Sequence, residues 1–351
     1  MVIRAFITHK KAEAFADCQD RFGVNGDTKS IAVSDGMGST WQQKIWAQLL
    51  VDTFTESADW QPKTDSIKPL CQIWRNKVLD FIQQLKDTNA PENIIYRNER
   101  NLAGGRSAGA TFLGIRFNEK QWSGVVLGDS CLIEWDGEKA IFHTSQDVEA
   151  FDSFPDYFDS DVTKEGKGTP KNIAGELSDG KCLLLVSDPF SDFLLEHQKQ
   201  GDIAEYAQKI LSVSSHADFE LLVDDWRTKG MHNDDTTLVV VENDNSDSFA
   251  IVEQDDINAF IKKDKLEKKE KTEADGNQII SEKEQEKEKK EMATDSNCNS
   301  IPVDKTIVMN ELKNELKEKG QSLEKQSLMG WWNIINKAHK KVLGKYVIFK
   351  K

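Results

Sequence analysis

Apolar residues are distributed unevenly along this chain of 351 residues, and their distribution limits where a folded domain can lie. From residue 1 to about 245, short apolar runs alternate with Gly, Asn and Asp. From about 254 to 292 the chain is mostly charged, and such a stretch cannot bury enough apolar surface to offset the entropy of ordering. We therefore expect one folded domain over residues 1–245, a charged, disordered linker over 246–305 and a helical segment over 306–351.

The spacing of apolar residues within the first 245 predicts both strands and helices. Two apolar runs flank Asn25-Gly26, a pair that favours positive φ, and this predicts a β-hairpin. Strand-like runs follow closely on one another between residues 110 and 143, which favours an antiparallel sheet over βαβ units. Runs of strands and runs of helices without strict alternation predict a layered α+β fold. The helical patterns cover residues 40–56, 66–86, 189–196, 202–213 and 217–229, and further strands are expected at 182–187 and 236–242.

The charge of the chain argues against one class of partner. It has 46 Lys and Arg against 60 Asp and Glu, a formal charge of −14, and residues 1–250 hold 25 of the basic and 41 of the acidic side chains. A nucleic-acid-binding protein needs a basic footprint for the phosphate backbone, so no nucleic-acid partner is expected.

The cysteines and the apolar runs predict a compartment. The five cysteines are scattered, without a C-x-x-C pair or a Cys/His cluster, which disfavours a zinc site or a disulfide framework. The first twenty residues contain no apolar run of signal-peptide length, and no stretch approaches the roughly 20 apolar residues of a spanning helix. We therefore expect a soluble, cytoplasmic protein.

Five aspartates stand at the ends of expected strands. Asp20 begins the first strand of the hairpin and Asp35 follows the second, so folding about the turn brings both to one end of the sheet. Asp129 directly follows WSGVVLG, and Asp188 directly follows CLLLVS. Asp234 lies just before TTLVVVE, and it meets Asp188 if these two strands pair antiparallel.

Carboxylates that converge without basic partners repel one another, which raises their pKa values. A divalent cation relieves that repulsion, and carboxylate oxygens with water suit Mg²⁺ or Mn²⁺. Two such ions about 3.5–4 Å apart can share one carboxylate and one water. Gly36 has no side chain, so its carbonyl can approach an ion closely. Each motif alone is more typical of a turn or a strand cap, but their ordered combination is unlikely to be accidental and predicts a site for divalent cations.

The chain resembles the type 2C metal-dependent Ser/Thr protein phosphatase family over about residues 1–245. The resemblance implies two antiparallel sheets packed face to face and flanked by helices, a four-layer α-β-β-α arrangement with a dinuclear Mg²⁺ or Mn²⁺ site at one edge. It leaves the last hundred residues unexplained. The motifs that carry it, in order, are CQDRF, AVSDGMGS, SAGATFLGI, VLGDSCLIEWDG, LLLVSDPFSDFL and DDTTLVVV.

The same resemblance implies a role for each aspartate. Asp35 matches the ligand that bridges two ions, and with Asp20 it holds the attacking water. Asp129 matches a ligand of a weaker third ion. The implied reaction is hydrolysis of phosphoserine or phosphothreonine in a phosphoprotein, which opposes a Ser/Thr kinase in signalling. The complete set of matches to metal ligands is Asp20, Asp35, Gly36 through its carbonyl, Asp188, Asp234 and Asp129.

The sequence departs from the family at the phosphate-binding position. Many members place an arginine about five residues before the first aspartate, where this chain has Phe15. His9, Lys10 and Arg106 are candidate substitutes, although an exposed lysine is more often a solvated surface residue and is a poorer bidentate clamp than arginine. The missing arginine motivates an alternative function, a catalytically weak phosphatase-like module that binds phosphoproteins or scaffolds a kinase signalling system.

The end of the chain has the pattern of a basic amphipathic helix. From residue 326 on there are six lysines and no acidic side chain. At 100° per residue, Trp331 and Trp332 fall on an apolar face, with lysines on the opposite face. Such a helix fits the surface of its own acidic domain or of a partner protein, and a membrane surface less well, because His339 lies near the apolar face.

Overall fold

The computed structural model describes residues 1–145, 155–164, 166–246, 248–267 and 269. Met1–Lys271 group into one compact unit. The part of the predicted 246–305 linker from residue 270 on, and the predicted amphipathic helix over 306–351, fall outside the described residues.

Within the described residues, the strands form two large sheets and one small one. The two-stranded sheet pairs β4 (Gly109–Ala110) with β9 (Phe158–Asp159). The five-stranded sheet has the order β10 (Lys171–Glu176), β6 (Gln121–Leu127), β5 (Phe112–Asn118), β3 (Ser30–Ser34) and β2 (Arg21–Asn25). The six-stranded sheet has the order β13 (Ala250–Gln254), β1 (Val2–Thr8), β12 (Thr236–Glu242), β11 (Cys182–Val186), β7 (Cys131–Trp135) and β8 (Ala140–His143).

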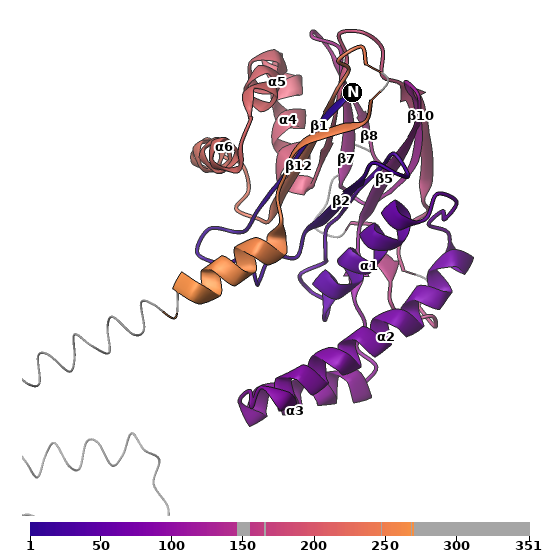
Figure 1. The fold of residues 1–351 in the computed structure, drawn as a ribbon, viewed down its shortest axis with the longest axis vertical. Coiled ribbons are helices and arrows are strands. Elements are labelled where there is room, and N and C mark those ends of the chain that lie inside the picture. Colours follow the sequence, from indigo (N-terminus) through magenta and orange to yellow (C-terminus); the bar gives the residue numbers. More distant parts are fainter. Residues whose placement is uncertain (146–154, 165, 247, 268, 270–351) are drawn as a thin grey trace, which may run out of the picture. The chain divides into compact units, whose positions relative to one another are not determined.

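Helices cover the outer face of each large sheet (Figure 1). On the five-stranded sheet lies α1 (Gln43–Glu56), while α2 (Thr64–Asp87) packs against α1 and α3 (Glu92–Ala103) packs against α2. Those beside the six-stranded sheet are α4 (Asp188–Gln200), α5 (Ile203–Ser212) and α6 (His216–Thr228). The layers therefore follow the order α-β-β-α.

Three buried clusters hold the layers together. Val33, Leu113 and Leu185 belong to the cluster that lies between the two sheets. Trp46 of α1 belongs to a second cluster on the outer face of the five-stranded sheet, and Trp226 of α6 to a third on the six-stranded sheet. A strand such as β11 is buried along its whole length because one face meets the other sheet and the other face meets helices, which explains its continuous apolar sequence.

The predicted fold class is confirmed, including the antiparallel pairing within both large sheets except at β13. The predicted hairpin of β2 and β3 is present, but the positive φ expected at Asn25-Gly26 lies elsewhere in its turn. The connection spans residues 26–29, positive φ occurs at Lys29 (47°), and the Asn25 side chain accepts a hydrogen bond from the Asp27 N–H at 2.9 Å. Asn25 therefore caps a longer loop and does not form a two-residue turn.

The folded part continues beyond residue 245, where the sequence predicted a linker. β13 pairs parallel with β1 at the edge of the six-stranded sheet, and a helix follows at residues 257–267. The prediction of a linker was wrong here because it rested on the charged composition of the region. Only one side of the helix faces the domain, so few apolar residues are needed to hold it there. Ile257, Phe260, Ile261 and Asp264 are partly buried, and the charged residues between them are exposed.

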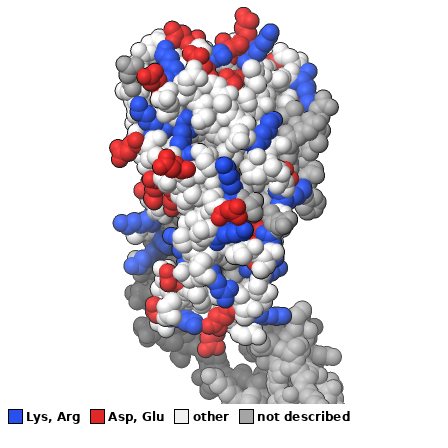
Figure 2. Space-filling view, turned by 90° about the vertical axis from the view of Figure 1, so that its right-hand side faces the viewer, with Lys and Arg blue, Asp and Glu red and all other residues white. Residues whose placement is uncertain are grey.

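The described surface carries both signs of charge. On the face seen in Figure 2, lysine and arginine are interspersed with aspartate and glutamate, and no continuous basic area is visible. In the described part of the chain, no helix combines the length and the apolar character that crossing a bilayer requires.

Candidate metal centre

Asp20 and Asp35 lie side by side at one end of the five-stranded sheet. Arg21 of β2 pairs with Ser34 of β3, so the residue before the first strand faces the residue after the second. Asp20 is fully buried, and its Oδ2 accepts a hydrogen bond from the Thr237 hydroxyl of the other sheet at 2.8 Å. The backbone of Asp35 is fixed by Thr111, which lies between β4 and β5: the Asp35 N–H donates to the Thr111 hydroxyl at 3.0 Å.

Asp188 and Asp234 meet at the matching end of the six-stranded sheet. Val186 of β11 pairs antiparallel with Leu238 of β12. Beyond this pair, the Thr237 N–H donates to the Ser187 hydroxyl at 2.9 Å, so the end of β11 and the start of β12 remain together. The antiparallel pairing that the sequence analysis required for these two aspartates is therefore present.

Asp129 lies where the chain passes from one large sheet to the other. It follows β6 and precedes β7, and it is 7% exposed. The Ser191 hydroxyl, in the first turn of α4, donates to the carbonyl oxygens of Asp129 at 3.2 Å and of Asp188 at 3.1 Å. This serine ties the β6–β7 connection to the start of α4, so the two aspartates stay close.

The electrostatics of these carboxyls agree with their convergence. Burial raises the pKa of Asp20 well above its ordinary value, and the charges of Asp35 and Asp235 raise it further. Burial also raises the pKa of Asp35 well above its ordinary value, and the charges of Asp188 and Asp129 add to the rise. The pKa of Asp188 is raised for the same reasons, first by burial and then by Asp129. Carboxyls from both sheets thus share one region of like charge, in which Asp20 and Asp129 are buried and Asp35, Asp188 and Asp234 are partly exposed.

The chemistry of this region fits a hard divalent cation. Asp20 Oδ1 is buried and receives no hydrogen bond, although a buried carboxylate oxygen normally has a donor or an ion beside it. A cation would supply that partner and would neutralise the mutual repulsion. Across the residues that the structure describes, no group of three or more His, Cys, Asp or Glu side chains is already arranged to hold an ion. The donor set fits the cation, and the side chains are not preassembled around it.

Gly36 lies against the backbone on two sides. A Cβ at this position would stand 3.1 Å from the Gln19 carbonyl oxygen and 2.9 Å from Cγ of Gln43, at the start of α1. Its backbone forms an isolated bridge with Ala110. A glycine is therefore needed here for close packing beside Asp20, independently of any carbonyl contact to an ion.

Two further aspartates belong to this region and were missed by the sequence analysis. Asp235, 2% exposed, accepts hydrogen bonds from the N–H groups of Lys10 at 3.0 Å and Gln19 at 2.7 Å. Asp192 contributes to the raised pKa of Asp188, and its own Oδ1 is buried and receives no hydrogen bond. The sequence held one usable signal: Asp192 follows Asp188 by four residues on a helix, and this spacing places both on one face.

The three candidate phosphate-binding residues have different surroundings. Lys10 Nζ lies 2.9 Å from Asp234 Oδ1, so this cation is at the candidate centre. His9 lies next to it in sequence, but its ring stands edge-on to Phe15 at 4.7 Å and its Nδ1 is 2.8 Å from the Lys10 carbonyl oxygen. Arg106 is exposed on the loop after α3, and no hydrogen bond or ion pair joins it to the aspartates in the described part of the chain.

The chain was compared with known families, curated proteins and solved structures. A family model described as Protein phosphatase 2C matches residues 9–219. No curated protein matches the chain. Among solved structures, it is similar to PppA, a key regulatory component of T6SS in Pseudomonas aeruginosa, with 18% identity and a TM-score of 0.43 over 69% of this chain and 98% of that one.

Two other similar structures are of one named phosphatase. The Mycobacterium tuberculosis serine/threonine phosphatase PstP/Ppp is 19% identical, with a TM-score of 0.40 over 68% of this chain and 96% of that one. The catalytic domain of serine threonine protein phosphatase PstP in complex with 2 manganese ions is also 19% identical, with a TM-score of 0.38 over 68% and 96% of the two chains.

Proposed function

This chain belongs to the protein phosphatase 2C family, and from that membership we propose that it is a Mg²⁺- or Mn²⁺-dependent hydrolase of phosphoserine and phosphothreonine in proteins. One observation carries the proposal: aspartates from the ends of both large sheets converge on one largely desolvated region, and the pKa values of Asp20, Asp35 and Asp188 are raised there. Buried like charges of this kind are typical of functional sites.

Different groups of aspartates would hold the different ions. Asp20, Asp35, Asp188 and Asp234, with the carbonyl of Gly36, would hold two ions between the sheets, and Asp35 would contact both. Asp129 would hold a third, weaker ion together with Asp188. Asp192 joins this last group in the proposal because its buried Oδ1 receives no hydrogen bond. When bound, the ions would lower the pKa of a shared water and neutralise charge on the phosphoryl oxygens.

Lys10 is the residue we propose for the phosphate. Its ammonium group is already at the centre, against Asp234, and its backbone N–H is fixed by Asp235. If Asp234 coordinates an ion, the ammonium group of Lys10 is available to attract the phosphoryl oxygens of the substrate. A lysine would orient the phosphate less strictly than a bidentate arginine, so a lower affinity for the phosphorylated side chain is expected.

The partners follow from the same proposal. The substrate is a phosphoprotein, and the reaction opposes a Ser/Thr kinase in signalling. A cytoplasmic location agrees with the four described cysteines, Cys18, Cys71, Cys131 and Cys182, which are free. We also propose that residues 270–305 act as a charged linker and that 306–351 form a basic helix, which docks on its own domain or on a partner protein and less readily on a membrane.

The test is hydrolysis of a phosphothreonine peptide by the full chain. Activity should require Mn²⁺ or Mg²⁺, should be abolished by EDTA, and should fall by roughly 10²–10³ in Asp35→Asn, which is typical for losing one electrostatic catalytic group. Asp27→Asn is the matched control, because Asp27 is an exposed aspartate in the neighbouring turn.

Two results would refute the proposal. Hydrolysis that survives EDTA would exclude a metal-dependent reaction. Phosphopeptide binding without hydrolysis and without tight Mn²⁺ binding by calorimetry would instead favour the non-catalytic phosphoprotein-binding module.

A further inference from the structure

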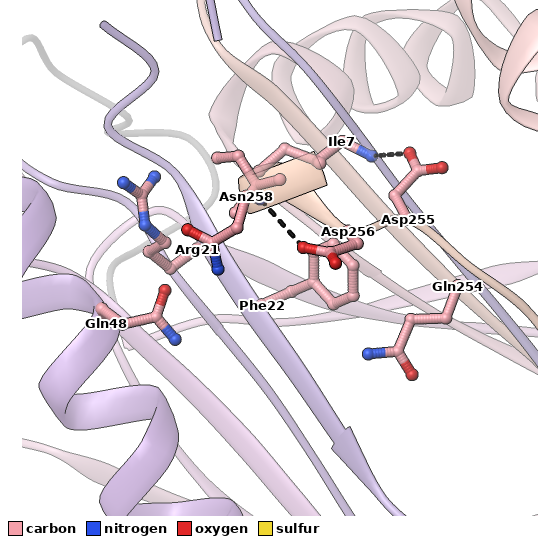
Figure 3. A pocket seen from close by; sticks show the side chains of 9 residues that line it. Ile7, Arg21, Phe22, Gln48, Gln254, Asp255, Asp256 and Asn258 are labelled. Atoms are coloured by element: carbon pink, nitrogen blue, oxygen red, sulfur yellow. Dashed lines mark hydrogen bonds between the residues drawn. The ribbon is translucent and has the colours of Figure 1, made fainter. Parts of the chain in front are cut away.

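The chain from residue 250 on returns to the first strand of the domain and runs beside it in the same direction. β13 pairs with β1, and Asp255 extends the contact: its N–H donates to the Ala5 carbonyl at 3.0 Å, and its Oδ2 accepts from the Ile7 N–H at 2.8 Å. We call residues 250–267, which comprise β13 and the helix at 257–267, the strap. Figure 3 shows Asp255 reaching Ile7 beside a cavity of about 340 Å³, whose other lining residues include Arg21, Phe22, Gln48, Asp256 and Asn258.

The helix of the strap packs on an aromatic cluster that contains Phe15. The ring centroid of Phe15 lies 4.6 Å from that of Phe260 in the strap and 5.9 Å from that of His216 in α6. His216 and Phe260 are themselves 4.3 Å apart. Phe15 is 6% exposed as a result, although it lies in a loop. The family's arginine position is therefore filled by a ring that the strap helps to bury.

The strap also binds the backbone at the same position. The Phe15 N–H donates to Asp264 Oδ2 at 3.1 Å, so one helix holds both the ring and the amide of this residue. A second support is Lys44 of α1, whose Nζ donates to the Ala16 carbonyl at 2.7 Å. These contacts fix the middle of the loop at residues 9–19.

Both ends of the 9–19 loop lie at the candidate metal centre. Asp235 accepts from the N–H groups of Lys10 and Gln19, and Asp20 follows directly. Any displacement of the middle of this loop therefore bears on Lys10 and on the first proposed metal ligand. A loop whose few tertiary contacts are removed opens at a lower free energy than the surrounding core.

We propose that the strap is a positioning element of the catalytic centre: Phe260 and Asp264 hold Phe15, and Phe15 holds the 9–19 loop in the geometry that places Lys10 and Asp20. Phe15, Phe260 and Asp264 are positioning residues, because they act through the loop and do not contact the substrate. The catalytic consequence rests on the proposed phosphatase function, whereas the ordering of the loop does not.

The experiment compares three variants of the full chain. Phe260→Ala removes the ring from the cluster, Phe260→Tyr keeps it, and Leu266→Ala is the control, because Leu266 is on the same helix and 54% exposed. In Phe260→Ala, the amides of residues 9–19 should exchange with solvent at least roughly tenfold faster, and Mn²⁺ affinity by calorimetry should fall about tenfold. The other two variants should stay within about twofold of the unmodified chain, and excess Mn²⁺ should restore most of the phosphatase kcat of Phe260→Ala.

A second pair of variants covers the case in which Phe260→Ala does not fold. Asp264→Ala removes the acceptor of the Phe15 N–H, and Asp264→Asn keeps an oxygen there. Faster exchange of the Lys10 and Gln19 amides, at the two ends of the loop, in the alanine variant alone would support the proposal. Unchanged exchange over 9–19 in both Phe260→Ala and Asp264→Ala would overturn it. An unmodified chain without activity would refute the phosphatase assignment instead, because the exchange measurement does not depend on catalysis.

Discussion

Gly36 shows how closely the backbone packs beside the candidate centre. Its neighbours include the Gln19 carbonyl oxygen and the backbone carbon of Gln43, each 3.1 Å from where a Cβ would stand. Backbone atoms cannot rotate away as a flexible side chain can. We therefore expect Gly36→Ala to shift Gln19, and with it Asp20, by a fraction of an ångström, and to lower kcat/KM by roughly tenfold to a hundredfold.

Gly38 is the matched control for this change. It lies two residues further along the same loop, and a Cβ there would come no closer than 3.4 Å, to the side chain of Gln19. Steady-state kinetics on a phosphopeptide should place Gly38→Ala within about threefold of the unmodified chain, since ordinary van der Waals contact requires no rearrangement. Equal losses in both variants would show that the crowding at Gly36 is not the cause.

Asp20 should destabilise the fold when no metal is bound. Its pKa is raised in the folded state, so it binds its proton more tightly there than in the unfolded chain. The stability from this group is fully present below the ordinary pKa of about 3.8 and is lost as pH rises through the folded-state pKa. At pH 7 without metal, Asp20→Asn should therefore melt higher than the unmodified chain, by about 2–4 °C for each 1 kcal/mol gained.

The same variant should respond weakly to metal. Scanning calorimetry with increasing Mn²⁺ should raise the Tm of the unmodified chain and should change that of Asp20→Asn little, so that the order of the two reverses. The advantage of Asp20→Asn in EDTA should also shrink as the pH is lowered toward 4. A Tm of the metal-free variant below that of the unmodified chain at pH 7 would contradict the raised pKa of Asp20 in the folded state.

At the scale of elements, the predictions from sequence were most accurate for helices and hairpins, which are formed by residues close together in the chain. The positions of Asp20 and Asp35 followed from one hairpin, whose register survives the longer turn at residues 26–29. Helices α1, α2, α4, α5 and α6 followed from their periodicity. In contrast, β13 is a short edge strand with mostly exposed residues, and it is stabilised by its parallel partner β1 at the other end of the domain's sequence. No local pattern encodes such a pairing.

The role of Phe15 could not be predicted for the same reason. Its neighbours Phe260 and His216 come from elements more than 200 residues away. A single phenylalanine in a loop gives no sign of which distant surface will cover it. The sequence therefore identified the missing arginine but not the cluster that stands in its place.

The contact between α6 and the strap should give the stability of the domain a dependence on pH. Burial lowers the pKa of His216, but the hydrogen bond to Asp255 at 2.8 Å and the charges of Asp255 and Glu220 raise it above its ordinary 6.5 overall. The stabilisation is therefore fully present below about pH 6.5 and is lost as pH rises through the folded-state pKa of this histidine.

Asp255→Asn is the variant that tests this contact, because asparagine keeps an acceptor for the Ile7 N–H and removes the charge. Urea unfolding should show a larger loss of stability at pH 6 than at pH 9, with the two losses differing by about 1 kcal/mol. Glu220→Gln is the control, since this glutamate is 48% exposed and 3.5 Å from the imidazole, and it should show a smaller difference. A loss for Asp255→Asn that is independent of pH would contradict the charged form of the pair.

At the scale of the whole molecule, the candidate centre is a product of how the two large sheets stack. Asp20 and Asp35 belong to one sheet, Asp188 and Asp234 to the other, and Asp129 to the connection between them. Neither sheet alone brings together more than two of these residues by its own pairing. The centre therefore depends on every contact that keeps the sheets in register, including those at the edge where β13 pairs with β1.

That dependence predicts where the chain can be shortened. A chain ending at residue 271 keeps β13, Phe260 and the buried Phe15, and it should match the full chain in Tm and in metal-dependent activity to within about twofold. A chain ending at residue 249 exposes the edge of β1 and uncovers Phe15. The lost burial of these aromatic side chains should reduce the free energy of unfolding by about 3 kcal/mol and therefore lower the Tm of this chain by roughly 6–12 °C.

Three chains measured together by scanning calorimetry and phosphopeptide hydrolysis decide the boundary. Equal melting of the chains ending at 249 and 271 would return the domain boundary to about residue 245 and would leave the strap without a role in stability. A clear difference between the 271 chain and the full chain would assign a function to residues 272–351, because it would mean that they act on the catalytic domain even though none of the proposed metal ligands lies there. Loss of activity at 249 alone would place the limit of the catalytic unit at the helix that buries Phe15, about twenty residues beyond the point at which the apolar pattern of the sequence ends.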